Sequence, residues 1–390
     1  MRNTALAAPV LAIEPQCRGF EHVRFNAGLL ATVAKACDSA PIEFWGDPAH
    51  ARMVVRELEQ HSQPPISTRA LGVRWSPVLW HRFRQETAFC QRVLASAARM
   101  GARLIVFTSV TAPGLIALKR SLERVGAEIP VWAVAHSVLA EAAKNPRRFW
   151  NYPLSIRRAM RLPTPDRLKL IALSEAAAGA AQALSNGATV YALDHPYLFR
   201  PLSRPRGPSD LARRPIRIGV PGAVRSRIRE ICGLIRQVRA GTDRVDFQVA
   251  GHVARDAAGR QDLLGLLPAT PEAPVDYAAY DRRLASVDYV LMLPDETQHR
   301  FAASCTVLEA FDHGKPGLGS PSPLLDEYRS KIGEFGIFPG SADRLAEAIL
   351  GMAQQFPAEQ YRAQTEVILA GRSRFAPAQV ALEMKRILAS

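Results

Sequence analysis

The sequence of 390 residues has few cysteines and no long apolar run. Its five cysteines are odd in number and scattered, and no two form a Cys-x-x-Cys pair, which argues against a zinc site and fits reduced thiols in a cytoplasm. The two most apolar windows, Leu104–Leu118 and Ile129–Ala140, are shorter than the ~20 residues that span a bilayer. No apolar signal-peptide core precedes Glu14. We therefore expect a soluble or peripheral protein of the cytoplasm.

Motifs of several enzyme classes are also missing. Gly314-Lys315 is followed by a proline and lacks the upstream glycine of a P-loop, and no Gly-x-Gly-x-x-Gly follows the first predicted strand. His-Glu-x-x-His, Asp-x-Asp and Gly-x-Ser-x-Gly are absent as well. These absences disfavour a P-loop enzyme, an NAD enzyme, a zinc protease and a serine hydrolase. We predict no metal ligands and no cofactor.

Compact apolar runs alternate with helical patterns along the whole chain, and 48% of the residues are hydrophobic. Strands buried on both faces of a parallel sheet have this pattern. The predicted strands are Val10–Ile13, Ile42–Trp45, Leu104–Phe107, Val131–Ala135, Leu168–Leu173, Ile216–Val220, Val245–Ala250 and Tyr289–Leu293. The predicted helices are Phe25–Ala36, Ala49–Gln60, Trp80–Met100, Ala112–Val125, Glu175–Leu184, Arg227–Arg239, Tyr277–Ala285, Cys305–His313, Ala342–Gln354, Pro357–Leu369 and Pro377–Leu388.

A proline-rich stretch, Pro201–Pro215, interrupts this alternation and is predicted to be a linker. The length of the chain also suggests two domains. We therefore predict an α/β protein with two tandem Rossmann-like domains, 1–200 and 216–375, and a cleft between them. A final helix in 376–390 could pack back on the N-terminal domain.

The positive charge lies almost entirely in the first half of the chain. Of the 50 basic residues only seven are lysines, and the formal net charge is +14. In the segments 69–103 and 144–169, arginines alternate with aromatic residues such as Trp75, Trp80, Trp150 and Tyr152. Such a mixture suits an anionic bilayer surface. A solvated basic face and a nucleic-acid surface are the alternatives, and we see no nucleic-acid motif.

The most informative stretch runs from Tyr280 to Ala348. It contains Leu284, Asp288-Tyr289-Val290-Leu291-Met292-Leu293-Pro294, the helix start Ser304-Cys305-Thr306, then Glu309-Ala310, Gly314-Lys315-Pro316 and Leu345-Ala346-Glu347-Ala348. In order and spacing it resembles the C-terminal domain of glycosyltransferases with the GT-B fold, of the kind that build bacterial polysaccharides and cell-surface glycans. The resemblance covers about seventy residues, and the two-domain organisation is consistent with it. It implies a nucleotide-sugar site in the second domain and an acceptor site in the first.

The residues expected to bind the nucleotide lie at two turns and one helix start. The helix that begins near Ser304 offers free N–H groups and a positive dipole end, which suit a diphosphate. The resemblance implies that Glu309 binds the ribose, and the alternative is a surface glutamate. A glycine-rich turn lets a ligand approach the backbone, and arginines can clamp a pyrophosphate. The candidates are Gly222, Arg225, Arg227, Gly251, Ser304, Cys305, Thr306 and Glu309, with His252 more readily a loop residue.

Three residues of the first half are candidates for the catalytic base. Glu21 and His22 open the first long helix, although an acidic residue also suits a helix start without any catalytic role. His136 ends a predicted strand at the edge of the sheet where ligands bind, and a structural role is the alternative. His195, before the linker, is more readily structural.

One position departs from the pattern of the family. Many retaining enzymes with this fold carry a second glutamate eight residues before Glu309, and here that residue is Phe301. This puts a retaining mechanism with that sugar contact in doubt.

The predicted function is metal-independent transfer of a sugar from a UDP- or GDP-sugar to a lipid-linked or membrane-proximal glycan, at the inner face of the cytoplasmic membrane. A nucleotide-sugar 2-epimerase and a non-catalytic binding protein are the alternatives.

Overall fold

Short, fully buried apolar runs form the central strands of the structure, which is a computed structural model. It describes residues 8–124, 128–143, 149–201, 215–295 and 300–390. Every residue of Val10–Ile13 (β1), Leu104–Phe107 (β4) and Val131–Val134 (β5) is buried. Because such strands have apolar side chains on both faces, helices must cover both faces of their sheet.

The first sheet contains, within the described residues, seven parallel strands in the order β3-β2-β1-β4-β5-β6-β7. The remaining strands are Ile42–Gly46 (β2), Ser67–Ala70 (β3), Leu168–Ala172 (β6) and Val190–Ala192 (β7). In register, Val10 lies opposite Ile42 on one side and Leu104 on the other. The strand order reverses between β1 and β4, and sheets of this kind bind ligands beyond the carboxyl ends of the strands at that point.

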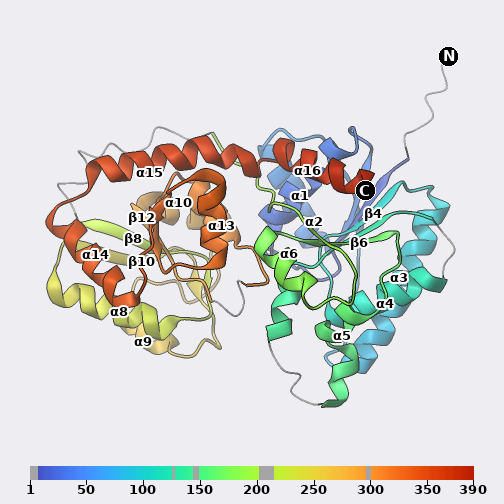
Figure 1. Cartoon of the computed structure of the whole chain (residues 1–390), viewed down its shortest axis with the longest axis horizontal. Coiled ribbons are helices and arrows are strands. Elements are labelled where there is room, and N and C mark those ends of the chain that lie inside the picture. Colours follow the sequence, from blue (N-terminus) through green and yellow to red (C-terminus); the bar gives the residue numbers. More distant parts are fainter. Residues whose placement is uncertain (1–7, 125–127, 144–148, 202–214, 296–299) are drawn as a thin grey trace. The chain divides into compact units, whose positions relative to one another are not determined.

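The helices around this sheet have apolar faces at the 3.6-residue period. They are Val23–Ala36 (α1), Pro48–Gln60 (α2), Leu79–Arg99 (α3), Ala112–Arg124 (α4), Ile156–Arg161 (α5), Glu175–Gln182 (α6) and Pro377–Ala389 (α16), with 3₁₀ turns at Ser137–Ala143, Phe149–Leu154 and Arg372–Phe375. Helix α16 packs along α1 (Figure 1), and Lys385 pairs there with Asp38.

The second sheet is parallel, with five strands within the described residues in the order β10-β8-β12-β13-β14. These strands are Ile216–Val220 (β8), Val245–Val249 (β10), Tyr289–Met292 (β12), Gly317–Gly319 (β13) and Gly336–Ile337 (β14), and the short pair Ala223–Val224 (β9) and His252–Val253 (β11) lies apart from them. The helices are Ile228–Gly241 (α8), Arg260–Leu266 (α9), Tyr277–Ser286 (α10), Cys305–Asp312 (α12), Pro323–Ile332 (α13), Ala342–Gln354 (α14) and Ala358–Gly371 (α15). The strand order reverses between β8 and β12.

The chain divides into two units. Unit 1 comprises Met1–Leu198, Thr297–Ala303 and Arg374–Ser390, and unit 2 comprises Phe199–Glu296 and Ser304–Ser373. The predicted α/β class with two parallel sheets is confirmed. Most of the predicted linker, residues 202–214, lies outside the described residues.

Candidate functional site

A buried carboxylate, Glu14, follows β1 directly at the point where the first sheet reverses its strand order. Its side chain is 1% exposed and accepts hydrogen bonds from both sides of that point. The donors are Ser109 Oγ (2.5 Å), Thr108 Oγ1 (2.8 Å), Asn26 Nδ2 (3.3 Å) and the backbone N–H groups of Gln16 (2.8 Å) and Cys17 (3.0 Å). Burial alone would raise the pKa of Glu14, but these hydrogen bonds outweigh it and hold the pKa below its usual value. Glu14 is therefore a fixed negative charge.

The same hydrogen bonds organise the loop between β1 and α1. Asn26 Nδ2 also contacts His50 Nε2 (2.8 Å), and His50 Nδ1 contacts the carbonyl oxygen of Gly19 (3.0 Å). Because a carbonyl only accepts, Nδ1 of His50 carries the proton and Nε2 accepts from Asn26. Gly19 adopts φ +49°, a left-handed conformation that glycine permits without strain. The loop that carries Glu21 and His22 is thus tied to Glu14.

These loops enclose a cavity of about 170 Å³. It is lined by Glu14, Gln16, Cys17, Glu21, His22, Phe25, Thr108, Ser109 and His136. The structure therefore brings together the three residues that the sequence analysis selected as candidate bases. His22 is the N-cap of α1 at φ 52°, a conformation rare for residues other than glycine and frequent at functional sites.

The His136 ring packs against the rings of His22, Phe25 and His195. It lies at 90° to the His22 ring with a centroid distance of 4.8 Å, and it stacks on Phe25 at 5.2 Å. Its Nδ1 atom is buried and has no hydrogen-bond partner among the described residues. Burial is the main cause that holds the pKa of His136 well below its usual value, and the neighbouring His22 and His195 lower this pKa further. The imidazole is therefore neutral at pH 7.

His195 lies outside the cavity lining. It is 1% exposed and packs against Phe25 at a centroid distance of 5.0 Å. Burial lowers the pKa of His195 to about 4, and its Nδ1 atom lies 3.2 Å from the carbonyl oxygen of Pro196. Its Nε2 atom, like Nδ1 of His136, is buried and has no hydrogen-bond partner among the described residues.

In unit 2, two glycine turns come into direct contact at the carboxyl edge of the second sheet. A Cβ atom added to Gly251 would lie 2.0 Å from the carbonyl oxygen of Gly222, so only glycine fits there. Gly222 has φ +67° and lies beside the methyl group of Thr306. The turns after β8 and β10 therefore meet at the first turn of α12.

Helix α12 carries the remaining nucleotide candidates. Its N-cap, Ser304, makes no side-chain capping bond, and its hydroxyl lies 2.6 Å from that of Thr306. Glu309 lies four residues after Cys305, and its Oε1 atom is 3.9 Å from Cys305 Sγ. Glu309 is buried at 8% exposure and accepts a hydrogen bond from the Tyr280 hydroxyl (2.7 Å), which itself accepts one from the Gly222 N–H (3.2 Å). The side chain of Glu309 faces the glycine turn, and the surface alternative is wrong.

The two candidate arginines have separate surroundings. Arg225 is exposed and close to His252, whose pKa is lowered first by burial and then by the Arg225 charge. Arg227 is the N-cap of α8 at φ 60°, and it pairs with Glu230 at 3.3 Å. Arg225 thus faces the turn after β10, whereas the Arg227 side chain follows α8.

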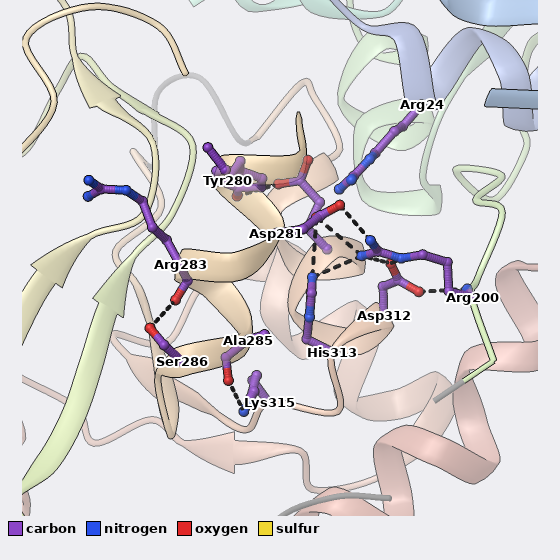
Figure 2. A network of polar contacts seen from close by, with 12 residues as sticks. Arg24, Arg200, Tyr280, Asp281, Arg283, Ala285, Ser286, Asp312, His313 and Lys315 are labelled. Carbon is purple, nitrogen blue, oxygen red and sulfur yellow. Dashed lines mark hydrogen bonds and ion pairs between the residues drawn. The ribbon is translucent and has the colours of Figure 1, made fainter. Parts of the chain in front are cut away.

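An ionic cluster holds the carboxyl end of α12 (Figure 2). Arg200 donates from Nε to Asp312 Oδ2 (2.8 Å) and from Nη1 to Asp281 Oδ2 (2.5 Å). Its backbone N–H also donates to Asp312 Oδ1 (2.8 Å). A cation is favourable at the carboxyl end of a helix dipole, and removing it would leave the 2%-exposed Asp312 as a buried charge. The cluster fixes the orientation of α12 within unit 2.

Phe301 occupies the position of the missing second glutamate. Its side chain is 7% exposed and belongs to the hydrophobic core of unit 1. No group of three or more His, Cys, Asp or Glu side chains suited to a metal ion occurs among the described residues.

From the sequence we did not predict Glu14, Thr108, Ser109 or Tyr280 as site residues. A signal for the first three was present, because Glu14 and the pair Thr108-Ser109 follow short apolar runs that end at the switch point of the sheet. Tyr280 was noted only as the start of the family pattern.

No protein family model and no curated protein sequence matches the chain. Solved structures do match its fold. The structure of HepE from Anabaena in complex with UDP has a TM-score of 0.65 at 16% identity and covers 98% of this chain and 99% of its own. Sucrose-phosphate synthase from Thermosynechococcus elongatus has a TM-score of 0.64 at 15% identity and covers 98% of each chain.

A putative UDP-N-acetylglucosamine 2-epimerase from Listeria monocytogenes is less similar. Its TM-score is 0.57 at 12% identity, with 98% of this chain and 95% of its own covered. At these identities the likeness shows the fold. The chain has the two-domain GT-B fold that its sequence pattern predicts.

Proposed function

We propose that the protein is a glycosyltransferase in which unit 2 binds a UDP-sugar and unit 1 binds the acceptor. The observation that carries this proposal is the arrangement of Gly222, Tyr280 and Glu309 at the first turn of α12. That arrangement places a backbone surface, a helix N-terminus and a buried carboxylate side by side, which together suit a diphosphate and a ribose. Structures of HepE, which has the same fold, contain UDP and UDP-glucose.

The proposed donor site accounts for the charge that develops on the leaving group. The diphosphate would lie against Gly222, Gly251 and the N–H groups at Ser304, Cys305 and Thr306, with Arg225 or Arg227 as its counter-charge. Fixed dipoles of this kind stabilise a departing diphosphate without having to reorganise. Glu309 would accept hydrogen bonds from the ribose hydroxyls. GDP is the alternative nucleotide.

The acceptor hydroxyl must lose its proton as it attacks the anomeric carbon. The new C–O bond forms while the bond to the diphosphate breaks, and the diphosphate leaves with the electron pair. We propose His136 as the proton acceptor, with His22 and Glu21 as the other candidates. His136 is supported by its place in the cavity lining and by its buried Nδ1 atom, which has no hydrogen-bond partner among the described residues.

The test is titration calorimetry of the full chain with UDP, GDP and their sugars, followed by assay of the bound nucleotide sugar. We expect UDP to bind with a dissociation constant at or below about 100 μM, and slow release of UDP from the UDP-sugar without an acceptor. If no nucleotide binds, the enzymatic proposal is wrong. Binding without any turnover in the presence of glycan acceptors would favour the non-catalytic alternative.

The alternative function, a nucleotide-sugar 2-epimerase, is supported by the fold shared with the putative UDP-N-acetylglucosamine 2-epimerase. It requires no acceptor. Proton NMR of UDP-N-acetylglucosamine incubated with the protein separates the two functions, since an epimerase yields the 2-epimer and a transferase does not.

We further propose that unit 1 contacts an anionic membrane at the cytoplasmic face, close to a lipid-linked glycan, through a smaller patch than the sequence suggested. Phe89 is buried and Phe83 is partly buried against the core, because the apolar face of α3 packs inward. Val78, Trp80 and Tyr152 remain 37–53% exposed, next to arginines such as Arg84. The side chain of Trp150 lies outside the described residues. No helix in the described ranges is long and apolar enough to cross a membrane.

Replacing Trp80 and Arg84 together by alanine should weaken membrane binding about tenfold. Each arginine near an anionic surface contributes ~1 kcal/mol, and an exposed tryptophan inserts at the headgroup level. Flotation with vesicles containing phosphatidylserine measures the bound fraction. The matched control replaces Leu382 and Arg386, an exposed apolar and a basic residue on α16, by alanine. Equal flotation of both variants and the wild type would contradict the patch.

A further inference from the structure

The cavity of unit 1 carries the opposite charge to the unit around it. Its lining contains two carboxylates, Glu14 and Glu21, and neither lysine nor arginine. Two arginines adjoin lining residues in the sequence, and both interact elsewhere: Arg18 donates to the carbonyl oxygen of Val73 (2.6 Å), and Arg24 pairs with Glu57 (3.8 Å). Among the described residues of the first half of the chain, the lysines and arginines therefore lie outside the cavity lining.

The remaining polar groups of the lining are neutral hydrogen-bonding groups. Ser109 donates to Glu14 and accepts from Gln16 Nε2 (3.2 Å), so Glu14 fixes the direction in which both side chains present their polar atoms. His136 contributes a neutral ring with one buried nitrogen that has no partner in the described parts of the chain. The N-terminus of α1 adds about half a positive charge, less than the two carboxylates remove.

We propose that this cavity binds a neutral, hydroxyl-bearing sugar unit and excludes phosphorylated or carboxylated sugars. Hydroxyl groups can donate to Glu21 or His136 and accept from Gln16, whereas an anion would face the negative charges of Glu14 and Glu21. The proposal rests on the acceptor role given to unit 1 and specifies its chemistry. Any anionic part of the acceptor, such as a lipid phosphate, remains outside the cavity.

The experiment uses the full chain labelled at the histidine ring carbons, with the His136 signal assigned from a His136→Gln variant. Glucose, galactose and N-acetylglucosamine are titrated, each beside its own 6-phosphate. We expect at least one neutral sugar to shift the His136 signal saturably in the millimolar range, and its 6-phosphate to bind at least about tenfold more weakly. A 6-phosphate that binds as tightly as its neutral sugar, or no shift with any neutral sugar, overturns the proposal.

Two variants connect the selectivity to the carboxylates. Glu21→Gln removes an exposed charge and should at least halve the preference for the neutral sugar while the protein stays folded. Glu14→Gln should reduce it further, and Glu21→Gln alone suffices if the Glu14 variant does not fold. An unchanged preference in Glu21→Gln and in a folded Glu14→Gln would contradict the electrostatic explanation.

The outcome for the cavity is separable from the outcome for the proposed function. UDP is titrated into the same samples and monitored by calorimetry. Binding of a neutral sugar without binding of UDP would support the proposal for the cavity and contradict the glycosyltransferase function. Binding of UDP together with tight binding of a phosphorylated sugar would support the function and contradict the proposal for the cavity.

Discussion

The variant Glu309→Gln is expected to bind UDP and UDP-sugars about 10- to 100-fold more weakly than the wild type. The side chain is buried and held by the Tyr280 hydroxyl at 2.7 Å. A hydrogen bond to a charged group contributes ~1.5–3 kcal/mol to binding. The glutamine side chain has the same shape as glutamate but no charge, so this contribution is reduced. Titration calorimetry measures the loss directly.

A deoxynucleotide distinguishes a ribose contact from a general disturbance of unit 2. If Glu309 accepts from the ribose hydroxyls, 2′-deoxy- or 3′-deoxy-UDP should bind the wild type more weakly, and the variant should lose little more with the same ligand. The matched control is Glu347→Gln, an exposed glutamate on α14. Fully additive losses for both deoxynucleotides would show that Glu309 acts elsewhere.

Most of the fold could be predicted because its strands are buried on both faces. The runs Val10–Ile13, Leu104–Phe107 and Ile216–Val220 are strands with the predicted bounds. The edge strand Ser67–Ala70 was missed because all four residues are exposed and the segment has no apolar run. Gly317–Gly319 was missed because glycine has little β-propensity, yet glycine is required there, since a Cβ on Gly319 would lie 1.8 Å from the carbonyl oxygen of Met292.

Site residues could be predicted where a side chain capable of acid–base chemistry follows a predicted strand. Glu21, His22 and His136 follow strands whose carboxyl ends share one edge of the sheet, and the structure places all three around one cavity. The position of Glu14 after a strand could be read from the sequence, but the hydrogen bonds that fix its charge come from Thr108 and Ser109, more than 90 residues away. Only the pairing of β1 with β4 brings these groups together.

Replacing His136 by glutamine is expected to lower the rate of UDP release from the bound UDP-sugar by a factor of about 10²–10⁴. This is the usual contribution of a general base, and glutamine retains hydrogen bonding but does not accept a proton. The affinity for UDP should stay within about twofold, because the nucleotide candidates lie in unit 2.

The pH dependence of the wild type tests the same assignment. A histidine whose pKa is held well below its usual value is still neutral as the pH falls from about 7.5 to about 5.5, so kcat/KM should change by less than about twofold over that range. A base with an ordinary histidine pKa would instead lose about tenfold in kcat/KM between about pH 7.5 and about pH 5.5. The control is His81→Ala, an exposed histidine on α3, which should leave both the rate and the profile unchanged. Full activity of His136→Gln would transfer the role of base to His22 or Glu21.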